Sequence, residues 1–174
     1  MTGEPESVVF ERLHDDVEAP SRATRESAGY DLRAYLAGRS VNVYRSREDR
    51  MDAEVPDSGE SGRARLALAP SDRALVPTGI KASLPSGYEA QIRIRSSLAL
   101  ERGLILPNAP GTVDADYPEE WFVLVQNASA HRQEVRHGER IAQAVLQRYE
   151  TLDWVEGTVG RSTARDGGFG STGR

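Results

Sequence analysis

The 174-residue sequence contains no cysteine and a single lysine, Lys81. Without cysteine, the chain can form no disulfide and can offer no thiol nucleophile. Three histidines are present, but they lack the spacing of a zinc site. Every other basic residue is arginine, which suits bidentate recognition of phosphate or carboxylate, although codon bias explains the same composition.

The sequence also lacks long apolar runs and a basic field. No run approaches the roughly 18 residues that cross a membrane. The first residues, MTGEPESVVFERL, are acidic and lack the apolar stretch of a signal peptide, so we expect a cytoplasmic protein without membrane contact. The net charge of −5 argues against a nucleic-acid partner, whereas a few arginines could still bind a small anion.

What the sequence does contain is a series of short alternating apolar runs between Gly, Pro, Asp and Ser turns. This pattern predicts an all-β sandwich or barrel. The segment RIAQAVLQRYE could also form a short helix, but its Ile and Val content favours a strand. The runs are SVVFERL, GYDLRAYL, ALVPTGIKASLP, YEAQIRIRS, WFVLVQNAS and RIAQAVLQRYE.

Two segments stand apart from this pattern. Residues 41–68 are predicted to be an inserted hairpin with VNVY and RLAL as its alternating arms and a charged, mobile loop between them. That loop is either a partner-binding arm or, more simply, a tolerated insertion. The tail GTVGRSTARDGGFGSTGR has little to bury and is expected to be disordered. We therefore divide the chain into a β domain, 1–156, and a mobile Gly-rich arm, 157–174.

Two carboxylates, Asp114 and Asp116, stand close together in PNAPGTVDADYPEEW. If TVDADY continues as a strand, both point to one face about 7 Å apart. Inverting glycosidases space their carboxylates similarly. Aromatic residues are only 6% of the chain, however, and this disfavours a sugar cleft. The pair alone is equally consistent with a solvated strand face.

Anion-binding groups appear in RIRSSLALERG, where Arg95, Ser96 and Ser97 follow one another. A guanidinium, two hydroxyls and the backbone N–H groups of a turn could hold a phosphate. A serine is also a good N-cap for a short SLALE helix, and the two interpretations are compatible.

Three further motifs are weak when taken singly. Asp31 lies in AGYDL, and Gln143 is a polar residue inside the apolar run of GERIAQAVL, where a buried amide would need partners. The tail motif GGFGSTG, residues 167–173, could wrap a ligand closely, yet it lacks the Gly-Lys-Ser/Thr ending of a Walker A loop.

In order, AGYDL, RSSLA, NAPGTVDADY, GERIAQ and GGFGSTG resemble the five motifs of the trimeric dUTPase family. The resemblance covers about residues 7–173 apart from the charged insertion. It implies a jelly-roll-like β domain that forms a homotrimer, with each active site shared between subunits. It also implies hydrolysis of dUTP to dUMP and pyrophosphate, which keeps uracil out of DNA and supplies dUMP for dTMP synthesis.

The resemblance assigns a role to each motif. Asp114 would be the general base that activates water, with Asp116 secondary. The hairpin from Asn108 to Tyr117 would read uracil, with Tyr117 under the deoxyribose, and Phe169 would stack on the base. Mg²⁺ would be held by the triphosphate and waters, which Asp31 would contact. The substrate-binding residues would be Arg95, Ser96, Ser97, Asn108, Gly111, Thr112, Val113, Tyr117, Gln143, Arg165, Phe169, Gly170, Ser171 and Thr172.

The sequence departs from the family pattern at three places. Ser97 stands where the family usually has glycine, and Pro118-Glu119 stand where Arg-Gly is common. In the tail, Arg165 is one residue nearer to the phenylalanine than the family's arginine, which makes Arg161 a substitute candidate.

Two alternatives remain open on these motifs. The dCTP deaminases share the fold, and RSSLA resembles their second motif better, but Val125 occupies the place of their glutamate base. A non-catalytic dUTP-binding regulator that grips a partner with the charged insertion is the other alternative.

Overall fold

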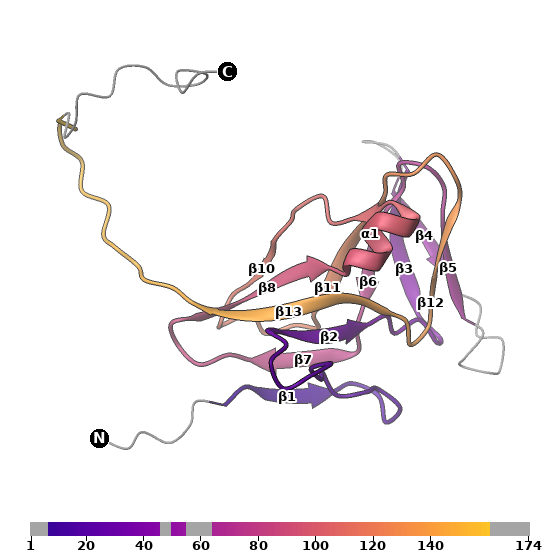
Figure 1. Ribbon diagram of the computed structural model, residues 1–174, viewed down its shortest axis with the longest axis horizontal. Coiled ribbons are helices and arrows are strands. Elements are labelled where there is room, and N and C mark those ends of the chain that lie inside the picture. The colour runs from indigo at the N-terminus through magenta and orange to yellow at the C-terminus, as the bar shows by residue number, and fades with distance from the viewer. Residues whose placement is uncertain (1–6, 46–49, 55–63, 161–174) are drawn as a thin grey trace.

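The computed structural model describes residues 7–45, 50–54 and 64–160, and the regular secondary structure of these residues is almost entirely short strands (Figure 1). The first seven are β1 (Val9–Arg12), β2 (Gly29–Arg33), β3 (Ser40–Tyr44), β4 (Arg50–Glu54), β5 (Arg65–Leu68), β6 (Arg73–Pro77) and β7 (Ile80–Ser83). They are followed by β8 (Tyr88–Ile94), helix α1 (Ser96–Arg102), β9 (Leu104–Ile105), β10 (Gly111–Val113), β11 (Phe122–Asn127), β12 (Gln133–Arg136) and β13 (Arg140–Arg148).

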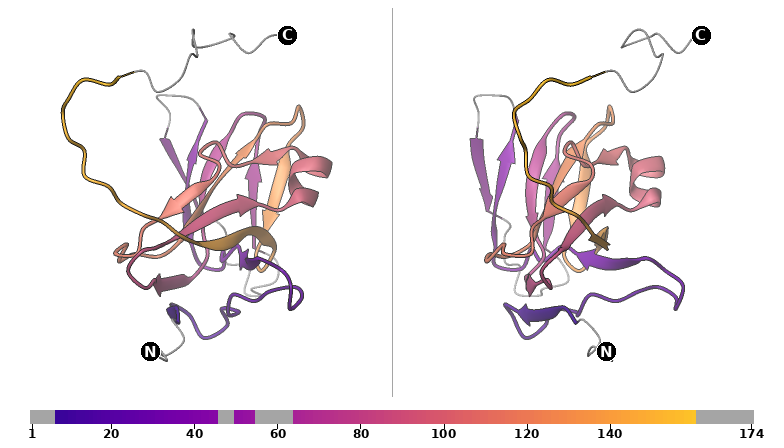
Figure 2. Two further views of the ribbon diagram at one scale, coloured as in Figure 1. Left: turned by 60° about the vertical axis from the view of Figure 1, so that its left-hand side comes forward. Right: turned by 90° about the vertical axis from the view of Figure 1, so that its left-hand side faces the viewer.

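The strands form two main antiparallel sheets, with orders β10-β8-β13-β2 and β4-β3-β6-β11-β9 (Figures 1 and 2). Two smaller pairs, β1-β7 and β12-β5, complete the fold. Buried side chains from both main sheets, such as Ile92 and Ala142 from one and Val76 and Val123 from the other, belong to one apolar cluster. The predicted all-β, jelly-roll-like architecture is confirmed.

Strand β13 confirms the choice of strand over helix for RIAQAVLQRYE. It pairs with β2 on one side and with β8 on the other, so its backbone hydrogen bonds go to neighbours in the sheet. Ile141, Ala142 and Ala144 are buried, while Gln143 is only half-buried. The apolar pattern of this segment fits a helix or a strand, and the hydrogen bonds to strands on both sides decide for the strand.

The predicted hairpin between VNVY and RLAL is wrong. VNVY forms β3, which pairs with β4 and β6, whereas RLAL forms β5, which pairs with β12. The alternation of both segments reports burial in the same core, and it does not say which strand pairs with which. Part of the charged stretch, residues 50–54, is strand β4, so the expected loop is interrupted. Residues 46–49 and 55–63 lie outside the described residues.

The expected strand TVDADY is also wrong beyond its first part. Strand β10 ends at Val113, and residues 115 and 116 form a turn in which the Tyr117 N–H donates to the Asp114 carbonyl at 3.2 Å. Aspartate favours turns because its side chain competes for backbone hydrogen bonds. Asp114 and Asp116 therefore do not share one strand face.

Beyond Tyr149 the chain leaves the sheets as an extended segment (Figure 1). Leu152, Trp154, Val155 and Val159 of this segment are at least 84% exposed. Residues 161–174, which hold most of the predicted arm, lie outside the described residues. Across the described residues, no helix has both the length and the apolar character that crossing a membrane requires.

Candidate active site

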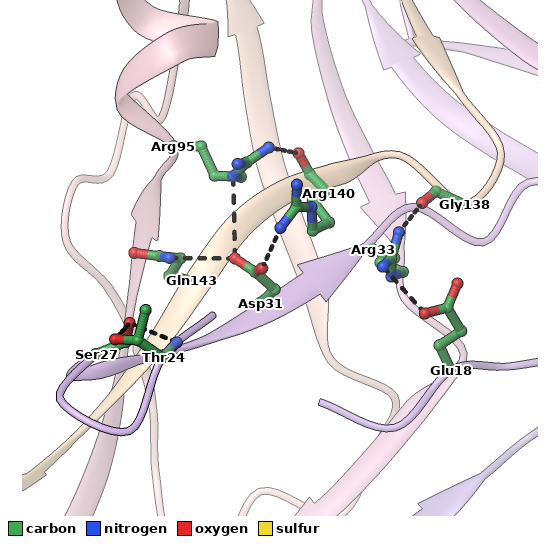
Figure 3. A network of polar contacts seen from close by, with 9 residues as sticks. All are labelled: Glu18, Thr24, Ser27, Asp31, Arg33, Arg95, Gly138, Arg140 and Gln143. Atoms are coloured by element: carbon green, nitrogen blue, oxygen red, sulfur yellow. Dashed lines mark hydrogen bonds and ion pairs between the residues drawn. The ribbon is translucent and has the colours of Figure 1, made fainter. Parts of the chain in front are cut away.

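A buried carboxylate, that of Asp31, gathers three donor side chains, two from β13 and one from the residue that precedes α1 (Figure 3). Arg140 Nη1 donates to Asp31 Oδ2 at 3.0 Å, and Gln143 Nε2 donates to Asp31 Oδ1 at 3.1 Å. Arg95 Nε lies 3.9 Å from Oδ1, and Arg95 Nη1 donates to the Arg140 carbonyl at 3.4 Å. Asp31 is 7% exposed, so these donors compensate the burial of its charge.

Strand register explains how two motifs far apart in sequence form this cluster. Asp31 in β2 is directly opposite Gln143 in β13, which brings the AGYDL and GERIAQ motifs together. A Cβ added to Gly29 would lie 2.8 Å from the Gln143 Cβ, closer than real Cβ contacts allow. Glycine is therefore required in AGYDL because the backbone of β2 lies directly against the Gln143 side chain.

Arg140 is a site residue that the sequence reasoning missed. It stands three residues before Gln143, and in a regular strand the two side chains would point to opposite faces. The register shifts between Arg140 and Ala142, and this irregularity brings both side chains to the same carboxylate. The GERIAQ motif was the available signal, but alternation alone could not place Arg140.

Helix α1 follows Arg95 directly and places Ser96 and Ser97 in its exposed first turn. The short SLALE helix is confirmed, but a serine is not its N-cap. The N-cap is Arg95, which has extended backbone geometry and makes no side-chain capping bond. Leu98 is buried and anchors the helix to the core, which leaves the two serine hydroxyls on its outer side.

The residues of the predicted uracil-reading hairpin, Asn108 to Tyr117, form a second group on β10 and its flanking turns. Gly111 is buried opposite Ile92, and a Cβ there would meet Asn108 Nδ2 and Ile92 Cβ, each at 3.3 Å. Val113 is buried and Thr112 is exposed. After the strand, Asp114 is exposed and Tyr117 is 40% exposed, so a carboxylate and a phenol both face the surface.

The two groups lie apart within one chain. Gln143 pairs with Arg93, whereas Val113 pairs with Ala90 three residues further along β8. Asp114 and Gln143 are thus four residues apart along the sheet and two strands apart across it. At ordinary strand dimensions this is roughly 15 Å. A single chain therefore does not bring Asp114 to the Asp31 cluster.

The remaining predicted site residues are Arg165, Phe169, Gly170, Ser171 and Thr172, with Arg161 as the substitute. All of them lie outside the described residues. Among the described residues, no group of three or more His, Cys, Asp or Glu side chains is placed to hold a metal ion.

Comparison with known proteins decides the family. The family model described as dUTPase matches residues 61–173. The chain belongs to the dUTPase family. The predicted family and the predicted enzyme class, dUTP diphosphatase, are confirmed.

A curated dUTPase relative and two solved dUTPase structures agree with this membership. The deoxyuridine 5'-triphosphate nucleotidohydrolase of Solibacter usitatus (strain Ellin6076) is 45% identical over 109 residues, or 63% of this chain and 74% of the relative. The dUTPase of Streptococcus mutans superposes with a TM-score of 0.60 at 24% identity, over 83% of this chain and 98% of that chain. A Staphylococcus bacteriophage 80alpha dUTPase variant with dUpNHpp gives 0.70 at 20% identity, over 96% and 98%. At these identities, the two structures support the fold.

Proposed function

We propose that this dUTPase hydrolyses dUTP to dUMP and pyrophosphate, with the triphosphate bound at the Asp31 cluster and the attacking water activated by Asp114. The observation that carries the proposal is the convergence of Arg95, Arg140 and Gln143 on one buried carboxylate. A pre-ordered set of cationic and amide donors is what a polyphosphate requires. The donors come from two of the family's motifs, RSSLA and GERIAQ, and a third motif, AGYDL, supplies Asp31.

The Asp31 cluster would act mainly by electrostatics. Arg95 and Arg140 are partly exposed, with side chains 28% and 41% accessible, so donors not used by Asp31 can meet a phosphate. Because Asp31 fixes their position in advance, little reorganisation is needed when charge develops at the reacting phosphate. The exposed Ser96 and Ser97 hydroxyls would add donors beside Arg95.

A magnesium ion would bind chiefly to the triphosphate and to water. A carboxylate has about four lone-pair sites, so the bonds from Arg140 and Gln143 leave Asp31 able to accept from a metal-bound water. Mg²⁺ characteristically retains several waters, which fits this indirect contact. When bound, the ion would neutralise charge on the phosphate oxygens.

The hairpin would supply base recognition and the proton acceptor. Asp114 is exposed beyond the end of β10, where it can reach both water and substrate. The backbone from Asn108 to Val113 would read uracil, and Tyr117 would pack under the deoxyribose. A hydrogen-bonding site of this kind rejects the wrong ligand by leaving polar groups unpaired or in collision. Phe169 and the phosphate-binding residues of the tail would complete the site.

We further propose a homotrimer in which the hairpin of one subunit faces the Asp31 cluster of another. The roughly 15 Å between Asp114 and Gln143 in one chain supports this arrangement. The exposed apolar side chains of residues 152–159 also support packing against another copy. An apolar cavity of about 380 Å³ beside β1 is lined by Phe10 and Trp121, and Trp121 Nε1 has no hydrogen-bond partner within the described residues.

The test is pyrophosphate release from dUTP, dCTP, dTTP and UTP, measured side by side with Mg²⁺ present. We expect release from dUTP far above the other three. Ammonia release from dCTP would support the deaminase alternative. Val125 argues against that alternative, because a fully buried apolar residue stands where the deaminases have their glutamate base. Binding of dUTP without release from any nucleotide would contradict the proposal and favour the regulator.

A further inference from the structure

A second buried carboxylate, that of Glu120, lies three residues after Tyr117 at the point where the hairpin segment enters β11. Glu120 is 7% exposed. Arg39 binds it with both terminal nitrogens, Nη2 to Oε2 at 2.6 Å and Nη1 to Oε1 at 3.3 Å. The Gly79 N–H donates to Oε1 at 2.7 Å. The carboxylate therefore joins the hairpin exit to two separate loops.

The backbone beside Glu120 is fixed to the same β6–β7 turn. The Trp121 N–H donates to the Ile80 carbonyl at 2.8 Å, and the Thr78 hydroxyl donates to the Trp121 carbonyl at 2.6 Å. Gly79 has a φ of +71°, and a Cβ there would lie 2.6 Å from Val17 Cγ2. Only glycine brings this N–H to Glu120 without strain.

The segment between β10 and Glu120, residues 114–119, has few polar contacts of its own, although Ala115 packs against the core. Most of it is exposed, and its internal support is the turn bond from Tyr117 to Asp114. The contact of Glu119 with Lys81 is 4.0 Å long and largely exposed, so it contributes little. The course of the segment is therefore set by the packing of Ala115 and by its two ends, which are the β10–β8 ladder and the Glu120 anchor.

We propose that the Arg39–Glu120 ion pair positions residues 114–119, and through them Asp114 and Tyr117, for dUTP hydrolysis and for discrimination against ribonucleotides. Both are assigned a positioning role, because the Glu120 carboxylate is buried and engaged by Arg39 and by the Gly79 N–H. The inference rests on the proposed function, because it assigns Asp114 and Tyr117 their roles. A displacement near 1 Å at a reacting group can cost about 100-fold in rate.

The test compares Glu120→Gln with wild type for kcat and KM on dUTP and on UTP. Glutamine keeps the shape and can still accept from Gly79, but it removes the charge that Arg39 grips with two bonds. We expect kcat/KM for dUTP to fall by about 10–100-fold and the preference for dUTP over UTP to fall with it. Arg39→Lys, which keeps the charge but loses the bidentate geometry, should show an intermediate loss.

A matched control is Glu134→Gln, which breaks the exposed Arg65–Glu134 pair at 3.1 Å in the β5–β12 ladder. Glu134→Gln should leave kcat/KM for dUTP and the preference for dUTP over UTP unchanged. Wild-type discrimination by folded Glu120→Gln would overturn the inference, as would a loss equal for dUTP and UTP that merely follows the folded fraction. If the wild-type protein does not hydrolyse dUTP, the proposed function itself is wrong. This result differs from failure of the positioning inference, in which the wild-type protein is active and Glu120→Gln keeps wild-type discrimination.

Discussion

Replacing Asp114 with asparagine is expected to lower kcat for dUTP by about 10²–10⁴-fold, the usual contribution of a general base. Asparagine has nearly the same shape, and the backbone carbonyl that receives the Tyr117 N–H is unaffected. The fold and the affinity for dUTP should therefore persist. Steady-state kinetics and direct dUTP binding by the variant measure the two quantities separately.

Asp116→Asn is the matched control for this prediction. Asp116 is an exposed carboxylate two residues further on, in the turn after β10. Its replacement should change kcat by no more than a few-fold, because the structure places it outside the strand face that a carboxylate pair would need. Near-normal turnover by Asp114→Asn would show that Asp114 is not the base, and an equally large loss with Asp116→Asn would contradict the secondary role of Asp116.

Replacing Asp31 with alanine is expected to damage both stability and phosphate binding. The change leaves Arg140 and Gln143 without their shared acceptor and removes the charge nearest to Arg95. Because the arginines are partly exposed and can be rehydrated, we expect a loss of about 2–3 kcal/mol in the free energy of unfolding, below the range for fully buried pairs. KM for dUTP should rise by at least about 10-fold, because Arg95 and Gln143 are no longer held in place.

Glu18→Ala is the comparison for Asp31→Ala. Glu18 pairs at 3.0 Å with Arg33, which lies on β2 together with Asp31 (Figure 3). The Glu18 side chain, however, is 63% exposed. Its loss should cost less than about 1 kcal/mol and leave KM unchanged. Denaturant unfolding at equal protein concentration, together with dUTP kinetics, tests both variants. An unchanged KM for a folded Asp31→Ala protein would contradict the anchoring role of Asp31.

Much of the fold could be predicted because alternation reports burial directly. WFVLVQNAS became a strand whose alternate residues are buried, and RIAQAVLQRYE became a strand that buries Ile141, Ala142 and Ala144. Strand pairing could not be predicted in the same way. VNVY and RLAL alternate equally well whether they pair with each other or with β4 and β12. Alternation fixes which face is buried, whereas pairing depends on contacts distant in sequence.

The candidate site was predicted to a different extent in each motif. Asp31, Arg95 and Gln143 were assigned to substrate binding or metal contact from separate motifs, and the structure brings them into one cluster. Arg140 was missed because only the register shift in β13 turns it toward Asp31. Glu120 was missed because nothing local in YPEEW distinguishes a buried glutamate from its exposed neighbour Glu119.

The central claim is that the Asn108–Tyr117 hairpin of one subunit meets the Asp31 cluster of another. Two variants combined in one assembly test it most directly: Asp114→Asn, and Arg95→Ala, which should lose most of its activity because a phosphate-binding guanidinium is removed. Asp114→Asn keeps an intact cluster, and Arg95→Ala keeps an intact hairpin. The two would be co-expressed with different tags, and assemblies carrying both tags purified. If sites are shared around a trimer, about one site in three regains both intact halves, so activity should recover to roughly a third of the wild-type rate. If mixed assemblies are no more active than the separate variants, each site lies within one chain and the shared-site account is wrong.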